Sequence, residues 1–467
     1  MLNKTIIRAP GPKGHFLLGN LMDVRRDRLE FVLRITGQYG DIVRFRMGHK
    51  TLHLINHPDY VKQVLLENSQ NYKKGLGLSH AKPLLGNGLL TSEGEFWQHQ
   101  RKLILPAFHR KKMDDFFSVM KQEIELMLKR WEVQVSREAA IDVYKEMMQL
   151  TLTILGRTLF SIDLTNKTDK LAQSFSLAVK EAIHRMTAMF ELSSYFPTPR
   201  NLRFRKALKI LDAFIYDLIN QRRQGQKSNN NADLLSMLLL ATDEKTEKKM
   251  NDKQLRDEIV TMLLAGHETT ALALTWSVYL LARHPKIQDT LRNKIKSFDA
   301  PQDFSYEQMA ELKYSRLVLD EAMRLYPPVW LIPRRAIGSD NIGGFHIPRK
   351  SEVLICVYAL HRHPAFWKEP NSFLPERFIS DEERRSKYAY LPFGAGPRTC
   401  IGNHFGLIEA QLALSMIVQK YIIGSKGGQE EIKPDPILTL RPKARIQLEL
   451  VPVKNNYSFA SSSKNFT

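Results

Sequence analysis

Cysteine and long apolar runs, which mark most exported and membrane-spanning chains, are scarce in this sequence. Cys356 and Cys400 are the only cysteines among 467 residues, so they offer no disulfide framework and are typical of a reducing compartment. Residues 1–10 carry Lys4 and Arg8 and contain no apolar run long enough for a signal peptide or a transmembrane anchor. We therefore expect a soluble, cytoplasmic protein.

The chain also lacks any linker, repeat or low-complexity stretch that would divide it. Its hydrophobic content of 43% is ample for one large core. The last residues are rich in Ser and Asn and poor in aliphatic side chains, as frayed ends are. The sequence thus predicts one domain over residues 1–453 and a flexible tail over 454–467.

Hydrophobic periodicity predicts a mainly α protein with a small β subdomain, an α+β fold. Apolar residues recur at helical spacing over 97–160, 171–223 and 252–284. Alternating apolar residues on both sides of a Gly-His-Lys turn predict a β-hairpin within 40–57. Further short strands are expected within 329–358.

Acidic residues are fewer than basic ones, 49 against 69, which gives a formal net charge of +20. Such a balance first suggests nucleic acid or an anionic surface as a partner. The lysines and arginines are spread over the whole length, however, and no nucleic-acid-binding motif occurs. We therefore expect no nucleic-acid partner and interpret most of these residues as a solvated surface.

The strongest functional pattern is a run in which glycines surround one cysteine. It reads Phe393-Gly394-Ala395-Gly396-Pro397-Arg398-Thr399-Cys400-Ile401-Gly402. A thiolate that ligates iron needs a tight loop whose backbone N–H groups point at the sulfur, and glycines permit such a loop. Cys356 stands instead in an apolar alternating run without glycine or a basic neighbour, and we expect it to be a packing residue.

Three further patterns place polar residues at helical spacing. Trp97 and Arg101 lie at i and i+4, so an indole N–H and a guanidinium can reach one carboxylate. Glu321 and Arg324 lie at i and i+3 on one helix face. In the run Ala-Gly-His-Glu-Thr-Thr at 265–270, glycine weakens a helix by about 1 kcal/mol relative to alanine, which indicates that something packs closely there.

Together these patterns resemble the cytochrome P450 superfamily, whose cysteine loop has the form Phe-x-x-Gly-x-Arg-x-Cys-x-Gly. The resemblance implies that fold, with haem between the oxygen-site helix at 252–284 and the helix after the cysteine loop. Cys400 would be the axial ligand of the haem iron. We expect the following helix to begin at Cys400, so that its N-terminal dipole stabilises the thiolate.

The resemblance also implies which residues hold the cofactor, haem b. Two propionates need charge-assisted bonds from more than one direction. Arg334 is preferred to the adjacent Arg335 for one of these bonds. Some members attach haem through a glutamate where this chain has Ala265, so non-covalent binding is expected. The expected cofactor-binding residues are Trp97, Arg101, Ala265, Gly266, Arg334, Phe393, Gly394, Arg398, Cys400 and Gly402.

Glu268 and Thr269 are the catalytic residues that the resemblance implies. Thr269 can donate a hydrogen bond to the Ala265 carbonyl, which bends the helix and leaves room for water. Glu268 would carry protons inward and Thr269 would direct them to the oxygen. A diatomic ligand is the expected neighbour of Gly266. The family more often has aspartate in place of this glutamate.

A structural lock is implied as well. In the family the Glu321–Arg324 pair is completed by an arginine of the Pro-Glu-Arg-Phe segment, here Arg377. A buried carboxylate between two guanidiniums is costly to break. The lock would fix the loop that presents Cys400.

Histidines are the competing ligands. His361 and His363 are separated by one residue without a cysteine or acid pair nearby, which is a poor metal spacing. His404 would lie one helical turn after Cys400. We expect packing or surface roles for all three histidines.

The expected function is a monooxygenase that inserts one atom of O2 into a small apolar substrate: a fatty acid, terpenoid or steroid-like molecule. The run from Leu325 to Pro328 and the Pro-Arg-Arg at 333–335 look most like the fatty-acid hydroxylase branch. Residues 70–90 would form a mobile loop over the substrate. Two alternatives stay open: a peroxide-using or isomerase-type haem-thiolate enzyme, and a haem-based binding protein.

Electrons would come from a separate acidic redox partner, a ferredoxin or flavodoxin with its reductase, because the chain ends soon after the cysteine loop. The resemblance places a basic cluster on the thiolate side of the haem, where a positive face would attract such a partner. This cluster comprises Arg101, Lys102, Arg110, Lys111 and Lys112.

Overall fold

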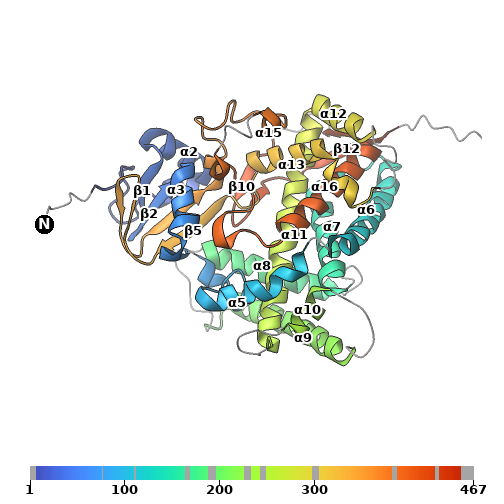
Figure 1. Cartoon of the computed structure of the whole chain (residues 1–467), viewed down its shortest axis with the longest axis horizontal. Helices are drawn as coiled ribbons and strands as arrows, with labels where there is room; N and C mark the ends of the chain where they lie inside the picture. The colour runs from blue at the N-terminus through green and yellow to red at the C-terminus, as the bar shows by residue number, and fades with distance from the viewer. Residues whose placement is uncertain are drawn as a thin grey trace, which may run out of the picture.

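A long central helix, α11, crosses the molecule, with other helices around it and a β-rich part at one side (Figure 1). The region expected to be a tail, 454–467, and Arg110 and Lys111 of the basic cluster lie outside the described residues. The computed structural model describes residues 7–75, 77–109, 112–162, 169–187, 196–225, 233–241, 249–296, 304–380, 386–425 and 431–453.

Most of the regular structure is helical, as the periodicity predicts. In chain order the helices are α1 (Leu21–Arg26), α2 (Arg28–Tyr39), α3 (Pro58–Lys62), α4 (Lys82–Leu85), α5 (Gly94–Ile104), α6 (Met113–Val135), α7 (Val143–Phe160), α8 (Asp169–Thr187), α9 (Pro199–Gly225), α10 (Leu234–Leu240), α11 (Asp252–Arg283), α12 (Pro285–Lys296), α13 (Lys313–Leu325), α14 (Val357–Leu360), α15 (Arg377–Ser380) and α16 (Asn403–Lys420).

The strands are short and form four small sheets within the described residues. They are β1 (Ile42–Met47), β2 (Lys50–Ile55), β3 (Tyr72–Lys74), β4 (Ile141–Asp142), β5 (Leu331–Ala336), β6 (Asp340–Ile342), β7 (Phe345–Ile347), β8 (Glu352–Cys356), β9 (Tyr421–Ser425), β10 (Pro434–Pro436), β11 (Leu440–Pro442) and β12 (Gln447–Pro452).

The largest sheet joins the two β-rich segments predicted at 40–57 and 329–358. Its strand order is β1-β2-β8-β5-β3, in which β2 and β8 pair in parallel and the other neighbours are antiparallel. The predicted hairpin of β1 and β2 turns at Gly48, whose φ of +59° favours glycine. The edge strand β3 was not predicted and lies within the segment 70–90 that we expected to be a mobile loop.

The helix α11 begins and ends where local signals place it. Asn251 and Gln254 form a capping box, in which each side chain accepts a hydrogen bond of 2.9 Å from the other residue's backbone N–H. His284 ends the helix because a residue before proline avoids the helical conformation. Most side chains of α11 are buried, and α7, α13 and α16 pack against it.

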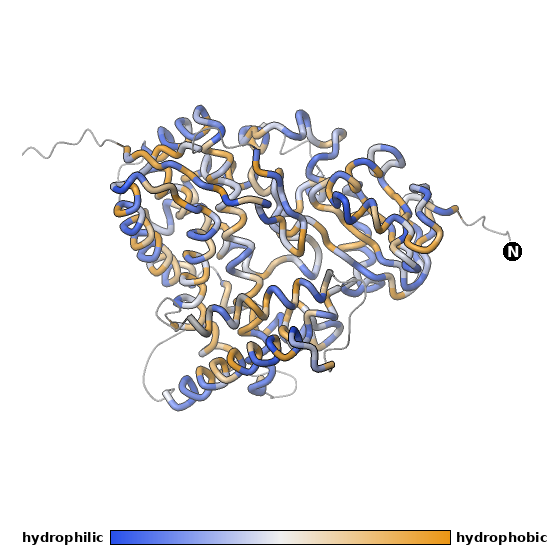
Figure 2. The backbone as a smooth tube through the Cα atoms, turned by 180° about the vertical axis from the view of Figure 1, so that it is seen from behind, coloured by the Kyte–Doolittle hydropathy of each residue, from blue (hydrophilic) through white to orange (hydrophobic). Residues whose placement is uncertain are grey.

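Hydrophobic and hydrophilic residues alternate along most of the chain (Figure 2). This pattern is expected where each helix or strand buries one face and exposes the other. The largest core cluster brings together α2, α6, α7, α11, α13 and α16. A second, smaller cluster lies under the main β-sheet and includes Leu391, which precedes the cysteine loop.

Candidate functional site

The cysteine loop folds back on itself before α16. The backbone N–H of Cys400 donates to the Phe393 carbonyl at 3.0 Å. Gly394 and Gly396 have φ values of +68° and +71°, which side chains other than glycine disfavour. A Cβ atom on Gly396 would also lie 1.8 Å from the Leu65 carbonyl oxygen. These two glycines are therefore required by the backbone of the loop.

The Cys400 side chain is accessible, although protein groups surround much of it. It is exposed, yet desolvation by surrounding protein raises its pKa, against the opposing effects of the Gly402 N–H and the Arg101 guanidinium. Cys356 is fully buried, and burial raises its pKa to about 12, so it fits the packing role predicted for it.

The expected start of the helix after the loop was wrong. Helix α16 begins at Asn403 with Gly402 as its N-cap, and its first backbone hydrogen bond runs from the Gly406 N–H to the Gly402 carbonyl. Cys400 therefore lies two residues before the N-cap of α16, with a turn at residues 401–402 between them. The donor directed at the sulfur is the Gly402 N–H, just before the helix.

Trp97 contacts two guanidiniums. The centre of its ring is 3.8 Å from the guanidinium carbon of Arg398 and 5.8 Å from that of Arg101, so both make cation–π contacts. Arg398 also donates to the Ser92 carbonyl at 2.9 Å and forms an ion pair with Glu93. Helix α5 and the cysteine loop thus bring three of the predicted cofactor-binding residues together.

A further arginine joins this group from the sheet. Arg334 on β5 lies directly opposite Lys74 on β3. Burial, with the nearby charges of Arg398 and Arg334, lowers the pKa of Lys74 to about 7. Burial and Arg398 lower the pKa of Arg334 to about 10. Arg335 points elsewhere and pairs with Glu352 at 2.5 Å.

The residues fit a cofactor with two carboxylates. Like charges opposite each other on a sheet are destabilising, and within the described residues Glu93 is the acid that opposes all three of these cations. Glu258 also lies near Lys74, but burial raises its pKa to about 8. A dianionic group beside Lys74, Arg334 and Arg398 would neutralise them. Sequence reasoning missed Lys74 and Glu93, since only the pairing of β3 with β5 shows their place.

The middle of α11 presents a short accessible face within an otherwise buried helix. Ala265 is exposed, and Gly266 and Thr269 are half-buried. The Thr269 hydroxyl donates to the Ala265 carbonyl at 2.8 Å, as predicted. A diatomic ligand was the expected neighbour of Gly266, but the space that a side chain at this position would occupy is filled by Leu155 of α7. A Cβ atom on Gly266 would lie 2.9 Å from the Leu155 side chain.

Glu268 faces away from Thr269 and is almost fully buried. Its Oε1 accepts hydrogen bonds from the Thr439 hydroxyl at 2.8 Å and from the Arg441 Nε at 2.5 Å. Neither partner was predicted, because no local pattern connects residues 173 positions apart. The carboxylate is therefore held by an ion pair with the C-terminal β-hairpin β10–β11.

The structure brings Glu321, Arg324 and Arg377 together in the interior. The Glu321 carboxylate accepts two hydrogen bonds from Arg324, at 2.7 and 2.8 Å, and one from Arg377 at 3.0 Å. The Leu374 N–H adds a fourth at 2.9 Å. The Arg324 guanidinium also donates to three backbone carbonyls, so the cluster binds α13 to the segment that leads to the cysteine loop. We propose that this cluster fixes the loop that presents Cys400.

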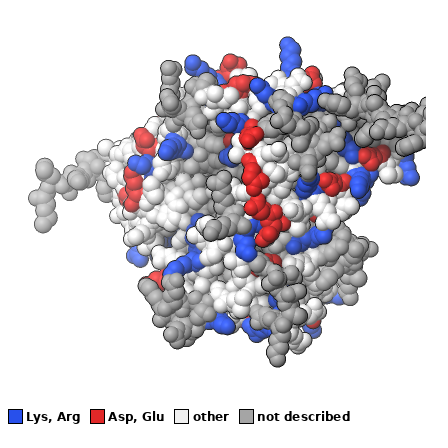
Figure 3. Space-filling model, turned by 45° about the vertical axis from the view of Figure 1, so that its right-hand side comes forward, with Lys and Arg blue, Asp and Glu red and all other residues white. Residues whose placement is uncertain are grey.

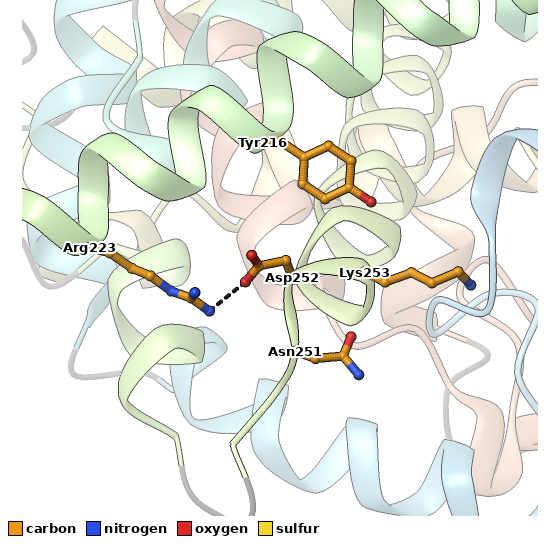
Figure 4. Close-up of a pocket in the computed structure, with 5 residues that line it drawn as sticks. All are labelled: Tyr216, Arg223, Asn251, Asp252 and Lys253. Carbon is orange, nitrogen blue, oxygen red and sulfur yellow. Dashed lines mark ion pairs between the residues drawn. The ribbon is translucent and has the colours of Figure 1, made fainter.

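Other parts of the surface offer no competing centre among the described residues. No three His, Cys, Asp or Glu side chains there gather as metal ligands would. A shallow pocket at the start of α11 is lined by Tyr216, Arg223, Asn251, Asp252 and Lys253 (Figure 4), none of which belongs to the predicted site. On the face in Figure 3 a band of acidic side chains runs down the middle, with basic side chains around it. Among the described helices, none contains an apolar stretch of the length that a membrane span requires.

Comparisons with known proteins show the family to which the chain belongs. The sequence matches the family profile "Cytochrome P450" over residues 9–450. It is 34% identical to cyclooctatin synthase of Streptomyces melanosporofaciens, over 96% of this chain and 94% of that protein. It is 33% identical to cyclooctat-9-en-7-ol 5-monooxygenase of the same species, over 87% of each chain. It is 28% identical to pentalenene oxygenase of Streptomyces avermitilis, over 96% of this chain and 98% of that one.

The chain therefore belongs to the cytochrome P450 family, and the predicted recognition and fold class are confirmed. It is a haem-thiolate monooxygenase, an oxidoreductase that uses O2 and electrons from a redox partner to oxygenate an apolar organic substrate.

Proposed function

We propose that Cys400 is the axial ligand of a haem b that the protein holds non-covalently. The observation that carries this proposal is the accessible Cys400 thiol beside Arg101 in a positively charged interior. Ala265, on the face of α11 that is accessible, offers no carboxylate for a covalent link. When bound, the haem supplies the iron at which O2 is activated.

Trp97, Arg101, Arg334 and Arg398 would hold the haem propionates, with Lys74 as a fifth partner. The cation–π contacts of Trp97 fix two of these guanidiniums before any ligand arrives, which lowers the entropy lost on binding. The repulsion among Lys74, Arg334 and Arg398 favours a dianion at this position.

The carbon monoxide complex of the reduced enzyme tests the ligand. A thiolate ligand should give a strongly red-shifted Soret band. We expect Cys400→Ser to abolish this band and Cys356→Ser, the matched control, to keep it. If the band survives in Cys400→Ser, Cys400 is not the ligand.

Thr269 and Glu268 would share proton delivery. Thr269 lies on the accessible face of α11, where its hydroxyl can orient a proton or a water molecule towards the oxygen site. Glu268 is bonded to Arg441, so it can pass a proton inward only when that ion pair loosens. Arg441→Leu should therefore change the rate of turnover, and an unchanged rate would exclude this coupling.

We propose a terpenoid as the substrate. The three relatives compared above carry names that refer to cyclooctatin, cyclooctat-9-en-7-ol and pentalenene. Substrates that displace water from the ferric iron shift it from low to high spin. Cyclic di- and sesquiterpenes should give this shift at lower concentration than fatty acids of equal carbon number. The reverse order would favour the fatty-acid hydroxylase branch.

The redox partner would be an acidic ferredoxin or flavodoxin. Lys102 is exposed and Lys112 is half-buried, whereas Arg101 lies near Cys400. A reducing compartment such as the cytoplasm would keep the Cys400 thiol available, and both cysteines are free.

A further inference from the structure

One fully buried imidazole lies between the Glu321 cluster and the cysteine loop. His361, directly after α14, has no accessible surface. Its Nε2 accepts a hydrogen bond of 2.8 Å from the backbone N–H of Leu391. Its Nδ1 lies 3.3 Å from the carbonyl oxygen of Arg324. The ring therefore touches the backbone of two segments that are far apart in the sequence.

These contacts fix the tautomer of the ring. Since Nε2 accepts the proton of the Leu391 N–H, the ring hydrogen must be on Nδ1, where it is donated to Arg324. The Arg324 carbonyl lies in the last turn of α13, where helical carbonyls have no partner within the helix. His361 thus satisfies one orphan acceptor and one loop donor with a single neutral side chain.

Arg324 holds His361 in return. Its Nη1 donates to the His361 carbonyl at 2.9 Å, while its other nitrogens hold the Glu321 carboxylate. Burial and the cations Arg324 and Arg362 lower the pKa of His361 to about 3, so the imidazole stays neutral. The position of the ring is therefore set by the same arginine that anchors the charged cluster.

From Leu391 the path continues to the sulfur-bearing residue through the backbone. The Gly394 N–H donates to the Leu391 carbonyl at 3.3 Å, and the Cys400 N–H donates to the Phe393 carbonyl at 3.0 Å. A displacement of Leu391 would move the start of this folded loop. No other side chain within the described residues has a hydrogen bond to the Leu391 N–H in this structure.

We propose that His361 is a positioning residue: it transmits the fixed position of Glu321 and Arg324 to the loop that presents Cys400. This inference rests on Cys400 as the proposed ligand. It assigns a role in the site to a histidine for which the sequence predicted only packing or a surface position.

Two substitutions of similar size separate positioning from packing. His361→Gln keeps one donor and one acceptor, whereas His361→Met keeps the bulk and loses both. Hydrogen exchange of the holoenzyme should be about tenfold faster at residues 391–400 in His361→Met, the order expected when a buried donor loses its partner. In His361→Gln it should stay near the parent rate. Equal rates in both variants, whether slow or fast, would overturn the proposal.

Spectroscopy gives a second readout. The thiolate band of the carbon monoxide complex should be lost at lower urea concentration in His361→Met than in His361→Gln, while the far-UV circular dichroism midpoints of the two agree. If the urea midpoint for loss of the thiolate band is the same as the circular dichroism midpoint in His361→Met, the role of His361 is purely structural and the proposal is overturned.

His363→Gln is the control, since this half-buried histidine contacts Asp41 at 2.9 Å and not the loop. Exchange at 391–400 should be unchanged in it, and faster exchange there would count against His361 as the specific link. If His361→Met does not fold, hydrogen exchange of the unmutated protein still tests the proposal. A Leu391 amide that exchanges without protection would overturn it. Failure of the ligand assignment would appear separately, as a thiolate band retained in Cys400→Ser.

Discussion

Replacing Glu321 by alanine should destabilise the protein far more than breaking a surface ion pair. The Glu321 carboxylate accepts hydrogen bonds from Arg324, Arg377 and the Leu374 N–H at 2.7–3.0 Å. Glu321 and Arg324 have 0% of their surface exposed and Arg377 has 6%, so Glu321→Ala leaves two guanidiniums in the interior without their carboxylate. Removal of one partner from a buried pair costs about 3–5 kcal/mol.

The matched control is the ion pair drawn in Figure 4. Arg223 and Asp252 lie 2.5 Å apart, but their side chains are 45% and 43% exposed. Arg223→Ala should therefore cost at most about 1 kcal/mol. Urea unfolding followed by far-UV circular dichroism gives both values. If Glu321→Ala shifts the midpoint no more than Arg223→Ala does, the buried cluster does not stabilise the fold as argued.

Three shorter predictions concern the site and its surroundings. Thr269→Ala should keep consuming reductant and O2 but release more hydrogen peroxide and less product, whereas Thr270→Ala, whose side chain is buried, should not; the opposite result would place the oxygen site one residue away. Burial raises the pKa of Glu258 from 4.5 to about 8, so the folded protein holds an extra proton between these values and loses stability as pH rises through them. Urea midpoints of Glu258→Gln should fall less over this range, and an equal fall in variant and parent would contradict the assignment. Neutralising Lys102 and Lys112 should slow reduction by an acidic partner at low salt without changing substrate affinity, and stopped-flow rates equal to those of the parent would exclude a docking role.

Local features of the fold and the site could be predicted because they depend on neighbouring residues. The glycines of the cysteine loop adopt positive φ values that the sequence pattern demands. Helix α11 starts at a capping box and ends before a proline, and the Glu321–Arg324 contact follows from their spacing on one helix. The hairpin of β1 and β2 followed from alternation around a turn.

The contacts that surround the site were decided by the tertiary structure. Lys74 meets Arg334 through the register of two strands, Glu268 meets Arg441 across 173 residues, and His361 meets Leu391 across 30. A lysine, an arginine or a histidine carries no sign of its distant partner, because such a pairing depends on how whole elements pack and not on local spacing. The family, the glycines of the cysteine loop and the extent of α11 could therefore be predicted from the residues alone. Only the folded chain decided which charges gather beside them and what holds the loop in place.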